Sequence, residues 1–248
     1  KPPPVFPIFE YELSLHFHFL KAYESSLPTS EFLAAANAFG VSAILAGSKD
    51  RITAADVLDH LPSLRCIVTT TTGLNHIDMQ ECRRRGIAVA FAGDIYCADA
   101  SVGLLIDVLR RVSAGDRFVR NCAWRSQRKF PLGNRVLTQI QLTGKRIGIV
   151  GLGSIGLRVA KRLEAFGCSI LYNSRQKKPS VSYLYYSDVC QLAASSDVLV
   201  ICCALTDQTW HMINREVLLA LGKEGVIINI GRGHIINERE LVRSFTGR

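Results

Sequence analysis

The sequence has 248 residues, of which 48% are hydrophobic and 21% are charged, a composition that excludes a disordered chain. Its longest apolar runs are shorter than the ~18 residues that cross a bilayer, so we expect no membrane partner. The net charge is +9, but the Lys and Arg residues are scattered and lack interleaved aromatic residues, so we expect a solvated surface and no nucleic-acid partner.

The opening ten residues lack the pattern of a signal peptide and do not begin with Met, so we expect a fragment and no secretion. The eight cysteines form no CxxC pair, and four of them fall in strand-like runs. We therefore expect reduced thiols in a cytoplasmic protein. The His, Cys and carboxylate residues do not cluster with the spacing of metal ligands, so no metal is expected.

From residue 41 the sequence alternates strand-like and helical patterns. The strand-like runs are 41–47, 64–72 and 87–93, and the helical patterns between them are 52–62 and 76–86. Such alternation predicts a parallel sheet with crossover helices. Before it, residues 13–20 alternate like a strand. After it, a long amphipathic helix is predicted from Ala98 to Asn121, joining two lobes.

The second half of the chain repeats this alternation after an irregular connection. Residues 124–145 are polar and contain proline and glycine, which favours a segment running over the surface. Strands are then predicted at 146–151, 168–174, 197–205 and 225–231, and helices at 156–167, 187–196 and 214–222. The predicted fold class is therefore α/β, with one lobe in residues 1–98 and a second in residues 99–248.

The run IGIVGLGSIG places Gly151, Gly153 and Gly156 in GxGxxG spacing, between a predicted strand and a predicted helix. The first glycine permits a tight turn, the second lets the backbone approach a pyrophosphate, and the third lets the helix pack closely on the strand. With the intervening Leu152, Ser154 and Ile155, this loop predicts dinucleotide binding. The alternative is a purely structural turn.

The end of the next strand indicates which dinucleotide is bound. NAD sites usually place an Asp or Glu there for the ribose 2′-hydroxyl. Here the strand is followed instead by Ser174, Arg175, Gln176, Lys177 and Lys178. We therefore predict that NADP(H) is preferred, with Ser174, Arg175 and Lys177 around the 2′-phosphate, while NAD(H) stays open as a second cofactor. The alternative is a solvated basic turn.

Arg232 follows the last predicted strand, between two glycines. Open α/β sheets bind ligands at the C-terminal ends of their strands. A guanidinium at that edge binds the carboxylate and carbonyl of a 2-oxo acid and polarises the carbonyl. We therefore predict that Arg232 is catalytic; the alternative is a surface arginine in a Gly-Arg-Gly turn.

Five motifs, taken in order, make the chain resemble a known family. They are TTGLNHID (71–78), GKRIGIVGLGSIG (144–156), YNSRQKK (172–178), CALTDQTWHMIN (203–214) and INIGRGHIINERELV (228–242). The sequence resembles the D-isomer-specific 2-hydroxyacid dehydrogenases, and within them the plant-type hydroxypyruvate and glyoxylate reductases that prefer NADPH. The resemblance implies two Rossmann-like lobes: a partial, flavodoxin-like substrate lobe in residues 1–98 and a doubly wound NAD(P)-binding lobe in residues 99–248.

The resemblance also implies a reaction and several residue roles. The reaction is the NADPH-dependent reduction of small 2-oxo acids (hydroxypyruvate, glyoxylate or hydroxyphenylpyruvate) to D-2-hydroxy acids by a homodimer. Backbone N–H groups of Thr72 and Gly73 would bind the substrate carboxylate, and Arg232 would bind and polarise the 2-oxo acid. The residues implied to lie along the cofactor are Ala204, Leu205, Thr209, Ile230 and Gly231.

The sequence also departs from the family pattern, which continues beyond this arginine with a carboxylate and a histidine that acts as the general acid. We expect the chain ending at Arg248 to lack both, together with the last strands of the second lobe. Two alternatives therefore stay open: a truncated, non-catalytic dinucleotide-binding protein, and a cofactor-sensing interaction protein. His76 and His234 are predicted to be ordinary surface or turn histidines and not substitute acids.

Overall fold

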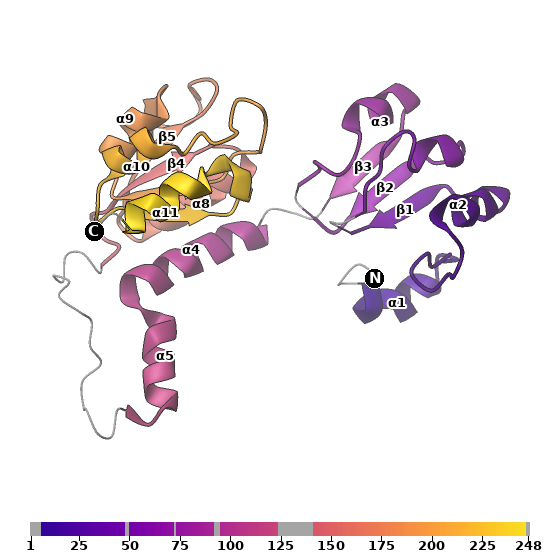
Figure 1. Ribbon diagram of the computed structural model, residues 1–248, viewed down its shortest axis with the longest axis horizontal. Helices are drawn as coiled ribbons and strands as arrows, with labels where there is room; N and C mark the ends of the chain where they lie inside the picture. The colour runs from indigo at the N-terminus through magenta and orange to yellow at the C-terminus, as the bar shows by residue number, and fades with distance from the viewer. Residues whose placement is uncertain (1–5, 48–49, 72, 92–94, 124–140, 247–248) are drawn as a thin grey trace. The chain divides into compact units, whose positions relative to one another are not determined.

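The computed structural model describes residues 6–47, 50–71, 73–91, 95–123 and 141–246 of the 248-residue chain (Figure 1). The protein is α/β and divides into two compact units, unit 1 in residues 1–93 and unit 2 in residues 94–248. The boundary predicted from the sequence, between residues 98 and 99, falls inside helix α4, the first helix of unit 2. Residues 124–140 of the predicted surface connection lie outside the described residues.

Unit 1 contains a parallel sheet in the order β1-β2-β3. Its elements are α1 (Phe6–Ser14), α2 (Thr29–Ala38), β1 (Ala43–Ala46), the 3-10 helix η1 (Leu58–His60), β2 (Cys66–Thr69), α3 (Met79–Arg85) and β3 (Ala88–Phe91). Ile67 on the central strand, Leu58 of η1 and Cys82 of α3 are fully buried in one hydrophobic cluster. All three strands were predicted from the sequence, and their positions are confirmed.

Two local predictions for unit 1 are wrong. Residues 52–62 do not form an α-helix, because Ile52 pairs with Ile77 and the chain reaches Pro62 after only turns and η1. Thr53 starts this segment as a turn instead, since its hydroxyl donates to Asp56 at 2.7 Å. Residues 13–20 do not form a strand either, because α1 continues to Ser14 and a turn follows it.

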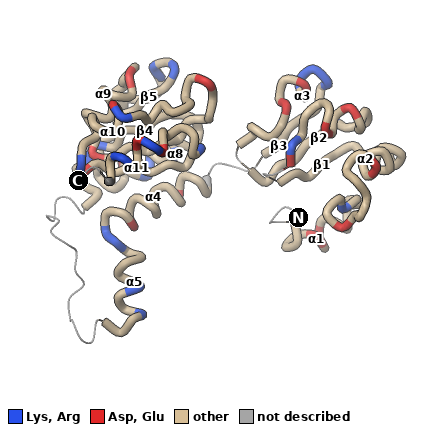
Figure 2. The backbone as a smooth tube through the Cα atoms, in the orientation of Figure 1, with Lys and Arg blue, Asp and Glu red and all other residues tan. Residues whose placement is uncertain are grey.

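The basic run at the end of α3 is paired with carboxylates. Arg84 donates to Glu81 at 2.5 and 2.8 Å. Arg85 donates to Glu81 at 2.6 Å and to the Leu58 carbonyl at 2.7 Å, and it forms an ion pair with Asp59. Hydrogen bonds from these two arginines lower the pKa of Glu81 to about 2. Part of the excess positive charge is thus used to join α3 to η1, and in Figure 2 the remaining Lys and Arg residues are interspersed with Asp and Glu.

Unit 2 contains a five-stranded parallel sheet in the order β6-β5-β4-β7-β8. Its strands are β4 (Arg146–Val150), β5 (Ser169–Asn173), β6 (Leu184–Tyr186), β7 (Val198–Ile201) and β8 (Val226–Asn229). Its helices are α4 (Ile95–Arg110), α5 (Val112–Arg120), α8 (Ser154–Ala165), α9 (Val189–Ala194), α10 (Arg215–Leu221), the 3-10 helix η2 (Gly233–Ile235) and α11 (Glu238–Thr246). The edge strand β6 was not predicted, because its three residues are only half-buried or exposed and give no clear alternation.

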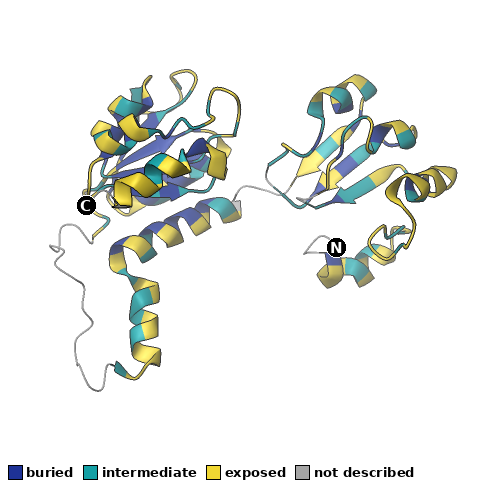
Figure 3. Ribbon diagram, viewed as in Figure 1, coloured by how far each residue is buried: buried dark blue, intermediate teal, exposed yellow. Residues whose placement is uncertain are grey.

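Alternating strand residues build two cores, one on each face of the sheet (Figure 3). On β7, Val198 and Val200 join the core formed with α4 and α8, whereas Leu199 and Ile201 join the core formed with α9 and α10. All four side chains are fully buried. Burial on both faces explains why β7 is a continuous apolar run in the sequence.

The single helix predicted from residue 98 to residue 121 is in fact two helices. Arg111 adopts a left-handed conformation (φ 54°), which ends α4 and begins α5. Asp107 stabilises the break, because its carboxylate accepts from the Ser113 N–H at 2.7 Å and from the Ser113 hydroxyl at 2.6 Å. The sequence has a helical pattern on both sides of this point, so the bend depends on a carboxylate of α4 that accepts hydrogen bonds from the first turn of α5.

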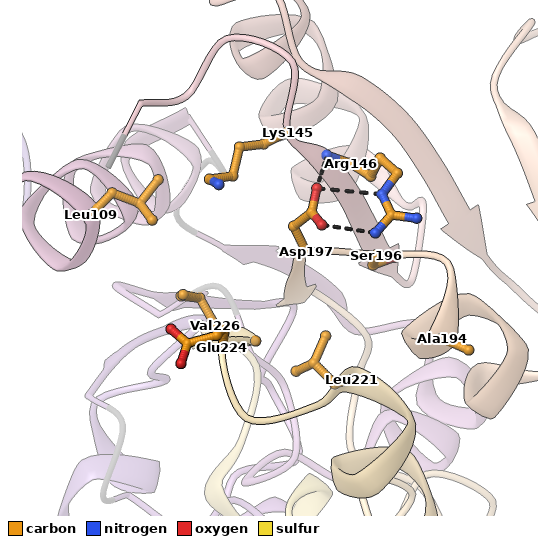
Figure 4. Close-up of a pocket in the computed structure, with 10 residues that line it drawn as sticks. Leu109, Lys145, Arg146, Ala194, Ser196, Asp197, Leu221, Glu224 and Val226 are labelled. Carbon is orange, nitrogen blue, oxygen red and sulfur yellow. Dashed lines mark hydrogen bonds and ion pairs between the residues drawn. The ribbon is translucent and has the colours of Figure 1, made fainter. Parts of the chain in front are cut away.

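An ion pair joins two neighbouring strands at the N-terminal edge of the sheet in unit 2. Asp197 accepts from the Arg146 backbone N–H at 2.8 Å and from its guanidinium at 2.8 and 3.4 Å. These bonds hold the first residue of β4 to the residue before β7, and they lower the pKa of the Asp197 carboxyl. Figure 4 shows the pair beside a cavity of about 300 Å³ that Leu109, Leu221 and Val226 also line.

Candidate dinucleotide and oxo-acid site

The candidate site lies at the C-terminal edge of the sheet in unit 2, at the opposite end from this cavity. Strand β4 is flanked by β5 on one side and by β7 on the other, so the order of the strands along the chain reverses there. Open α/β sheets bind ligands at such a switch point, just beyond the C-terminal ends of the strands. The glycine-rich loop follows β4, and the loop of residues 202–209 follows β7.

The glycine-rich loop is a tight turn that requires two of its glycines. Gly151 has a φ of +96°, and its N–H donates to the Asn173 carbonyl at 2.9 Å. A Cβ atom on Gly151 would lie 2.7 Å from the backbone of Cys203, and a Cβ on Gly156 would lie 2.2 Å from the Gly151 carbonyl oxygen. The predicted roles of the first and third glycines thus have a steric basis in these contacts.

The middle glycine faces open space at the start of α8. No atom lies within 4 Å of the position of a Cβ on Gly153. The first backbone bond of the helix runs from the Leu157 N–H to the Gly153 carbonyl at 2.9 Å, so the N–H groups of the three residues before Leu157 have no partner one turn back.

The start of α8 differs from those of α3, α9 and α10. Asp78, Asp188 and Asn214 cap α3, α9 and α10 through their side chains, whereas Gly153 offers α8 no side chain. Uncapped N–H groups and the positive end of the helix dipole favour an anion, and the absence of a Cβ leaves room for one. The loop of Gly151, Leu152, Gly153, Ser154, Ile155 and Gly156 therefore fits a pyrophosphate group.

The basic turn after β5 is held in place by groups that the sequence did not single out. The buried Tyr172 hydroxyl accepts from the Lys178 N–H at 2.8 Å, and Tyr185 donates to the Ser174 carbonyl at 3.2 Å. The Ser174 hydroxyl donates to the Gln176 carbonyl at 2.6 Å, which tightens the turn. Both ends of the turn are therefore fixed, while the side chains of Arg175 and Lys177 are exposed.

The loop after β7 is shaped by Thr209. Its hydroxyl donates to the Ala204 carbonyl at 2.7 Å and accepts from the Thr206 N–H at 2.7 Å. Leu205 packs against the core on the α9 and α10 face, whereas Ala204 is exposed. The Thr209 side chain thus closes the loop on itself and presents the loop backbone at the edge of the sheet.

The first two residues after β7, Cys202 and Cys203, both carry thiols. The Cys202 N–H continues the sheet by donating to the Val150 carbonyl at 2.8 Å. Burial raises the pKa of the Cys202 thiol to about 12, and burial also raises that of Cys203. Both groups are therefore neutral thiols near pH 7 and do not act as thiolate nucleophiles.

Arg232 lies in an extended conformation (φ −133°) directly before η2, and its side chain is exposed. Asn229 at the end of β8 positions this turn: its side-chain oxygen accepts from the Gly231 N–H at 3.0 Å, and its amide donates to the Arg232 carbonyl at 3.0 Å. Ile230 packs against the core on the α4 and α8 face. A Cβ on Gly231 would lie 2.9 Å from the Cys203 carbonyl, so the arginine turn passes close to the loop after β7.

The substrate loop proposed from the sequence belongs to unit 1, at the C-terminal end of β2. Thr72 lies outside the described residues. The Thr71 hydroxyl donates to the Gly73 carbonyl at 2.9 Å and lies 2.9 Å from the buried Thr69 hydroxyl. His76 points its Nε2 toward the same Thr69 hydroxyl at 3.5 Å. These contacts restrain Thr71 and Gly73, one of the two predicted carboxylate-binding residues.

Within the described residues, no group of three or more His, Cys, Asp or Glu side chains is arranged to hold a metal ion. No helix in that part of the chain is both long and apolar enough to span a membrane.

Comparison with known proteins gives one consistent family. The model of the family described as "D-isomer specific 2-hydroxyacid dehydrogenase, NAD binding domain" matches residues 102–247. A glyoxylate/hydroxypyruvate reductase of Arabidopsis thaliana, HPR3, is 54% identical over 191 residues, which are 76% of this chain and 57% of that protein. The hydroxyphenylpyruvate reductase of Plectranthus scutellarioides is 40% identical over 242 residues, which are 96% of this chain and 74% of that protein.

A solved structure agrees with these relatives. It is the NADPH-dependent glyoxylate/hydroxypyruvate reductase of Sinorhizobium meliloti in complex with NADP and malonate, which is 29% identical and superposes with a TM-score of 0.80. The match covers 99% of this chain and 74% of that chain. The chain thus spans between about half and three quarters of the length of these relatives.

Proposed function

Because the chain belongs to the family of D-isomer-specific 2-hydroxyacid dehydrogenases, we propose that it reduces small 2-oxo acids to D-2-hydroxy acids with NADPH. Hydroxypyruvate and glyoxylate are the first candidate substrates, and hydroxyphenylpyruvate is the third, since the relatives that it resembles are named for these compounds. The observation that carries the proposal is the combination of an uncapped glycine-rich helix start with an exposed arginine at the same edge of one sheet.

The cofactor would lie along the C-terminal edge of unit 2. The N–H groups at the start of α8 would bind its pyrophosphate. In the loop after β7, we assign Ala204, Leu205 and Thr209 to the lining of the cofactor. We assign Ile230 and Gly231 to the nicotinamide ribose. The close approach of Gly231 to the Cys203 carbonyl supports this assignment, because it brings the two loops together. When bound, NADPH supplies the hydride.

The preference for NADPH rests on the basic turn after β5. Asn173 ends the strand and uses its amide to donate to the carbonyls of Tyr186 and Ser187, at 2.9 and 3.1 Å. No carboxylate is present between Asn173 and Lys178 to accept a hydrogen bond from a ribose 2′-hydroxyl. Ser174, Arg175 and Lys177 would instead surround the 2′-phosphate, with Arg175 as the planar donor.

Arg232 would bind the carboxylate and the carbonyl oxygen of the substrate. Its positive charge stabilises the negative charge that develops on that oxygen during hydride attack. The same proposal assigns the backbone N–H groups of Thr72 and Gly73 to the substrate carboxylate. The bond from the Thr71 hydroxyl to the Gly73 carbonyl supports the role of Gly73, because it restrains that residue.

We further propose a homodimer in the cytoplasm. The outer sides of α4 and α5 expose four aliphatic side chains at 42 to 57% of their full area: Leu104, Val108, Val112 and Val119. A second copy of the chain would cover them. No cysteine of the described residues is assigned to a disulfide, which supports a reducing compartment. Sedimentation of the purified protein tests the dimer, and a monomer at micromolar concentration contradicts it.

The decisive experiment follows the oxidation of NADPH by absorbance after hydroxypyruvate, glyoxylate or hydroxyphenylpyruvate is added to the purified protein, with NADH in parallel. Turnover that is faster with NADPH supports the proposal. Protein that is folded by circular dichroism and binds NADPH, but oxidises none with any of the three acids, contradicts it and favours a dinucleotide-binding protein without reductase activity.

A further inference from the structure

The turn that carries Arg232 is tied to the loop after β7 by a short ladder of backbone bonds. The His211 N–H donates to the His234 carbonyl at 2.8 Å, and the Ile213 N–H donates to the Ile235 carbonyl at 3.0 Å. The Asn237 N–H then returns a bond to the Ile213 carbonyl at 3.0 Å. Residues 211–213 therefore run beside residues 234–237, although about twenty positions separate them in the sequence.

Aromatic rings reinforce this ladder at its open end. The Trp210 indole stacks on the His234 imidazole, with ring centroids 4.5 Å apart and ring planes 18° from parallel. The His211 ring lies 5.0 Å from the same indole. Trp210 is 50% exposed and belongs to neither hydrophobic core of unit 2, so its ring packs mainly on the arginine-bearing turn and on its own neighbour.

The backbone at His211 is in an uncommon conformation. His211 has a φ of 51°, in the left-handed region that residues with a Cβ rarely adopt. Such a conformation persists where surrounding contacts impose it, and it often marks functional segments. Here the imposing contacts are the His211 bond to the His234 carbonyl and the Trp210 stack on the His234 ring.

Arg232 is thus held from two directions. On the strand side, Asn229 fixes the Gly231 N–H and the Arg232 carbonyl. On the other side, the Ile235 N–H donates to the Arg232 carbonyl at 3.1 Å. Helix η2, which contains His234, is held in turn by the His211 bond to the His234 carbonyl and by the Trp210 stack on the His234 ring. The guanidinium itself has one bond among the described residues, to the neighbouring Gly231 carbonyl, so its position depends on the backbone of this turn.

We propose that Trp210 and His234 are positioning residues for Arg232. Their stack couples the loop that would hold the nicotinamide side of the cofactor to the turn that presents the guanidinium, and so sets the distance between hydride donor and polarising group. This inference rests on the proposed function, since Arg232 is assigned there to the 2-oxo acid. Neither ring is a proton donor in it; the imidazole acts through its flat face.

The first test replaces the rings and measures kcat and KM separately. Trp210→Ala and His234→Ala should each lower kcat/KM for hydroxypyruvate about 10- to 100-fold, because a small misplacement of a catalytic group has effects of that size. The Kd for NADPH should change little, since the pyrophosphate and the basic turn are untouched. His234→Phe, which keeps a flat ring and removes the ionisable nitrogen atoms, should restore most of the activity.

Two results of this test would overturn the inference. If His234→Phe is as impaired as His234→Ala, the chemistry of the imidazole matters and the stack does not. If Trp210→Ala lowers only the melting temperature, with kcat and KM unchanged, the ring is merely structural. Phe166→Ala is the matched control, because Phe166 is also an aromatic residue of unit 2 and is 46% exposed, but it ends α8 at the far end from the glycine-rich loop.

A second measurement does not depend on turnover. The sequence contains two tryptophans, so Trp124→Phe leaves Trp210 as the sole indole. In that background we expect His234→Ala to change the Trp210 emission and to speed amide hydrogen exchange at Ile235 and Ile236. If exchange is unchanged, the stack does not hold the turn and the inference fails. The unmodified protein could be inactive while His234→Ala still speeds amide hydrogen exchange as expected. In that case the proposed function fails, but the conclusion that the Trp210 stack on His234 holds the Arg232 turn is supported.

Discussion

A Cβ atom on Gly156 would lie 2.2 Å from the carbonyl oxygen of Gly151. Both atoms belong to the backbone or are fixed to it, so neither moves aside as the end of a flexible side chain does. Helix α8 lies this close to the end of β4 because residue 156 has no side chain. The distance therefore predicts what a single methyl group would do.

Gly156→Ala should destabilise the protein by about 1–3 kcal/mol, the usual cost of overpacking a core, and should weaken NADPH binding because the helix start is displaced. Urea unfolding and a fluorescence titration with NADPH measure the two effects. Gly103→Ala is the control: Gly103 lies in α4 with no atom within 4 Å of the added Cβ, and alanine there should add about 0.5–1 kcal/mol of helix stability. An equally stable Gly156→Ala protein would contradict the steric argument.

Arg175→Ala should impair the use of NADPH and leave the use of NADH nearly unchanged. Loss of a charge-assisted hydrogen bond costs about 1.5–3 kcal/mol, which corresponds to a rise of about 10- to 100-fold in the KM for NADPH. Steady-state kinetics with both cofactors measures the change. Lys223→Ala removes one exposed positive charge elsewhere in unit 2 and should leave both KM values unchanged. Equal losses with NADPH and NADH would indicate that Arg175 does not contact the 2′-phosphate.

Arg232→Lys should lower kcat/KM for hydroxypyruvate by about 100- to 1,000-fold, although the positive charge is kept. The reason is geometric, because an ammonium group lacks the planar pair of donors that matches a carboxylate. Arg239→Lys, in the exposed first turn of α11, is the matched control. The Kd for NADPH should be the same in all three proteins. Unimpaired turnover by Arg232→Lys would remove Arg232 from the reaction.

Asp197→Asn should lower stability near neutral pH, and the difference from the unmodified protein should shrink in acid. Hydrogen bonds from Arg146 lower the pKa of Asp197 in the folded state, so the stabilisation is present above the pKa of about 4 in the unfolded chain and is lost as the pH falls through the lower, folded value. Side-chain exposures of 52% for Arg146 and 35% for Asp197 limit the effect to about 1 kcal/mol.

Urea unfolding at neutral and at acidic pH measures this dependence on Asp197. Asp116→Asn is the control, because the Asp116 pair with Arg120 is more exposed, at 54% and 76%, and should contribute no more than about 0.5 kcal/mol. A loss of stability for Asp197→Asn that is the same at both pH values would show that packing, and not charge, accounts for it.

The sequence predicted those parts of the fold that short stretches determine. The central strands are confirmed because burial on both faces gives them continuous apolar runs, as in β7. The division into α4 and α5 was missed, because the helical pattern continues through Arg111 and only the Asp107 contact with Ser113 shows the break. The absence of a helix at residues 52–62 depends on the pairing of Ile52 with Ile77, which no local pattern reveals.

The same distinction between locally determined features and contacts made elsewhere applies to the candidate site. The glycine spacing identified the loop, because Gly151 and Gly156 each have a steric reason in nearby backbone, while Gly153 leaves open space at the start of α8. The partners that hold the site were not predicted: Asn229 and Tyr172 bond to backbone groups of the turns that follow their own strands, and Trp210 stacks on His234 from another loop. A side chain that holds a group outside its own strand leaves no periodic signal in the sequence.

The Tyr172 hydroxyl joins the buried centre of unit 2 to the N–H of Lys178, six residues later. The turn that would meet the adenosine end of the cofactor therefore takes its shape from the protein interior, and not only from its own residues. Transplanting the segment from Ser174 to Lys178 into a related NADH-dependent enzyme would carry over the charges without the anchor. The recipient enzyme should gain the use of NADPH only when the tyrosine is grafted together with this segment.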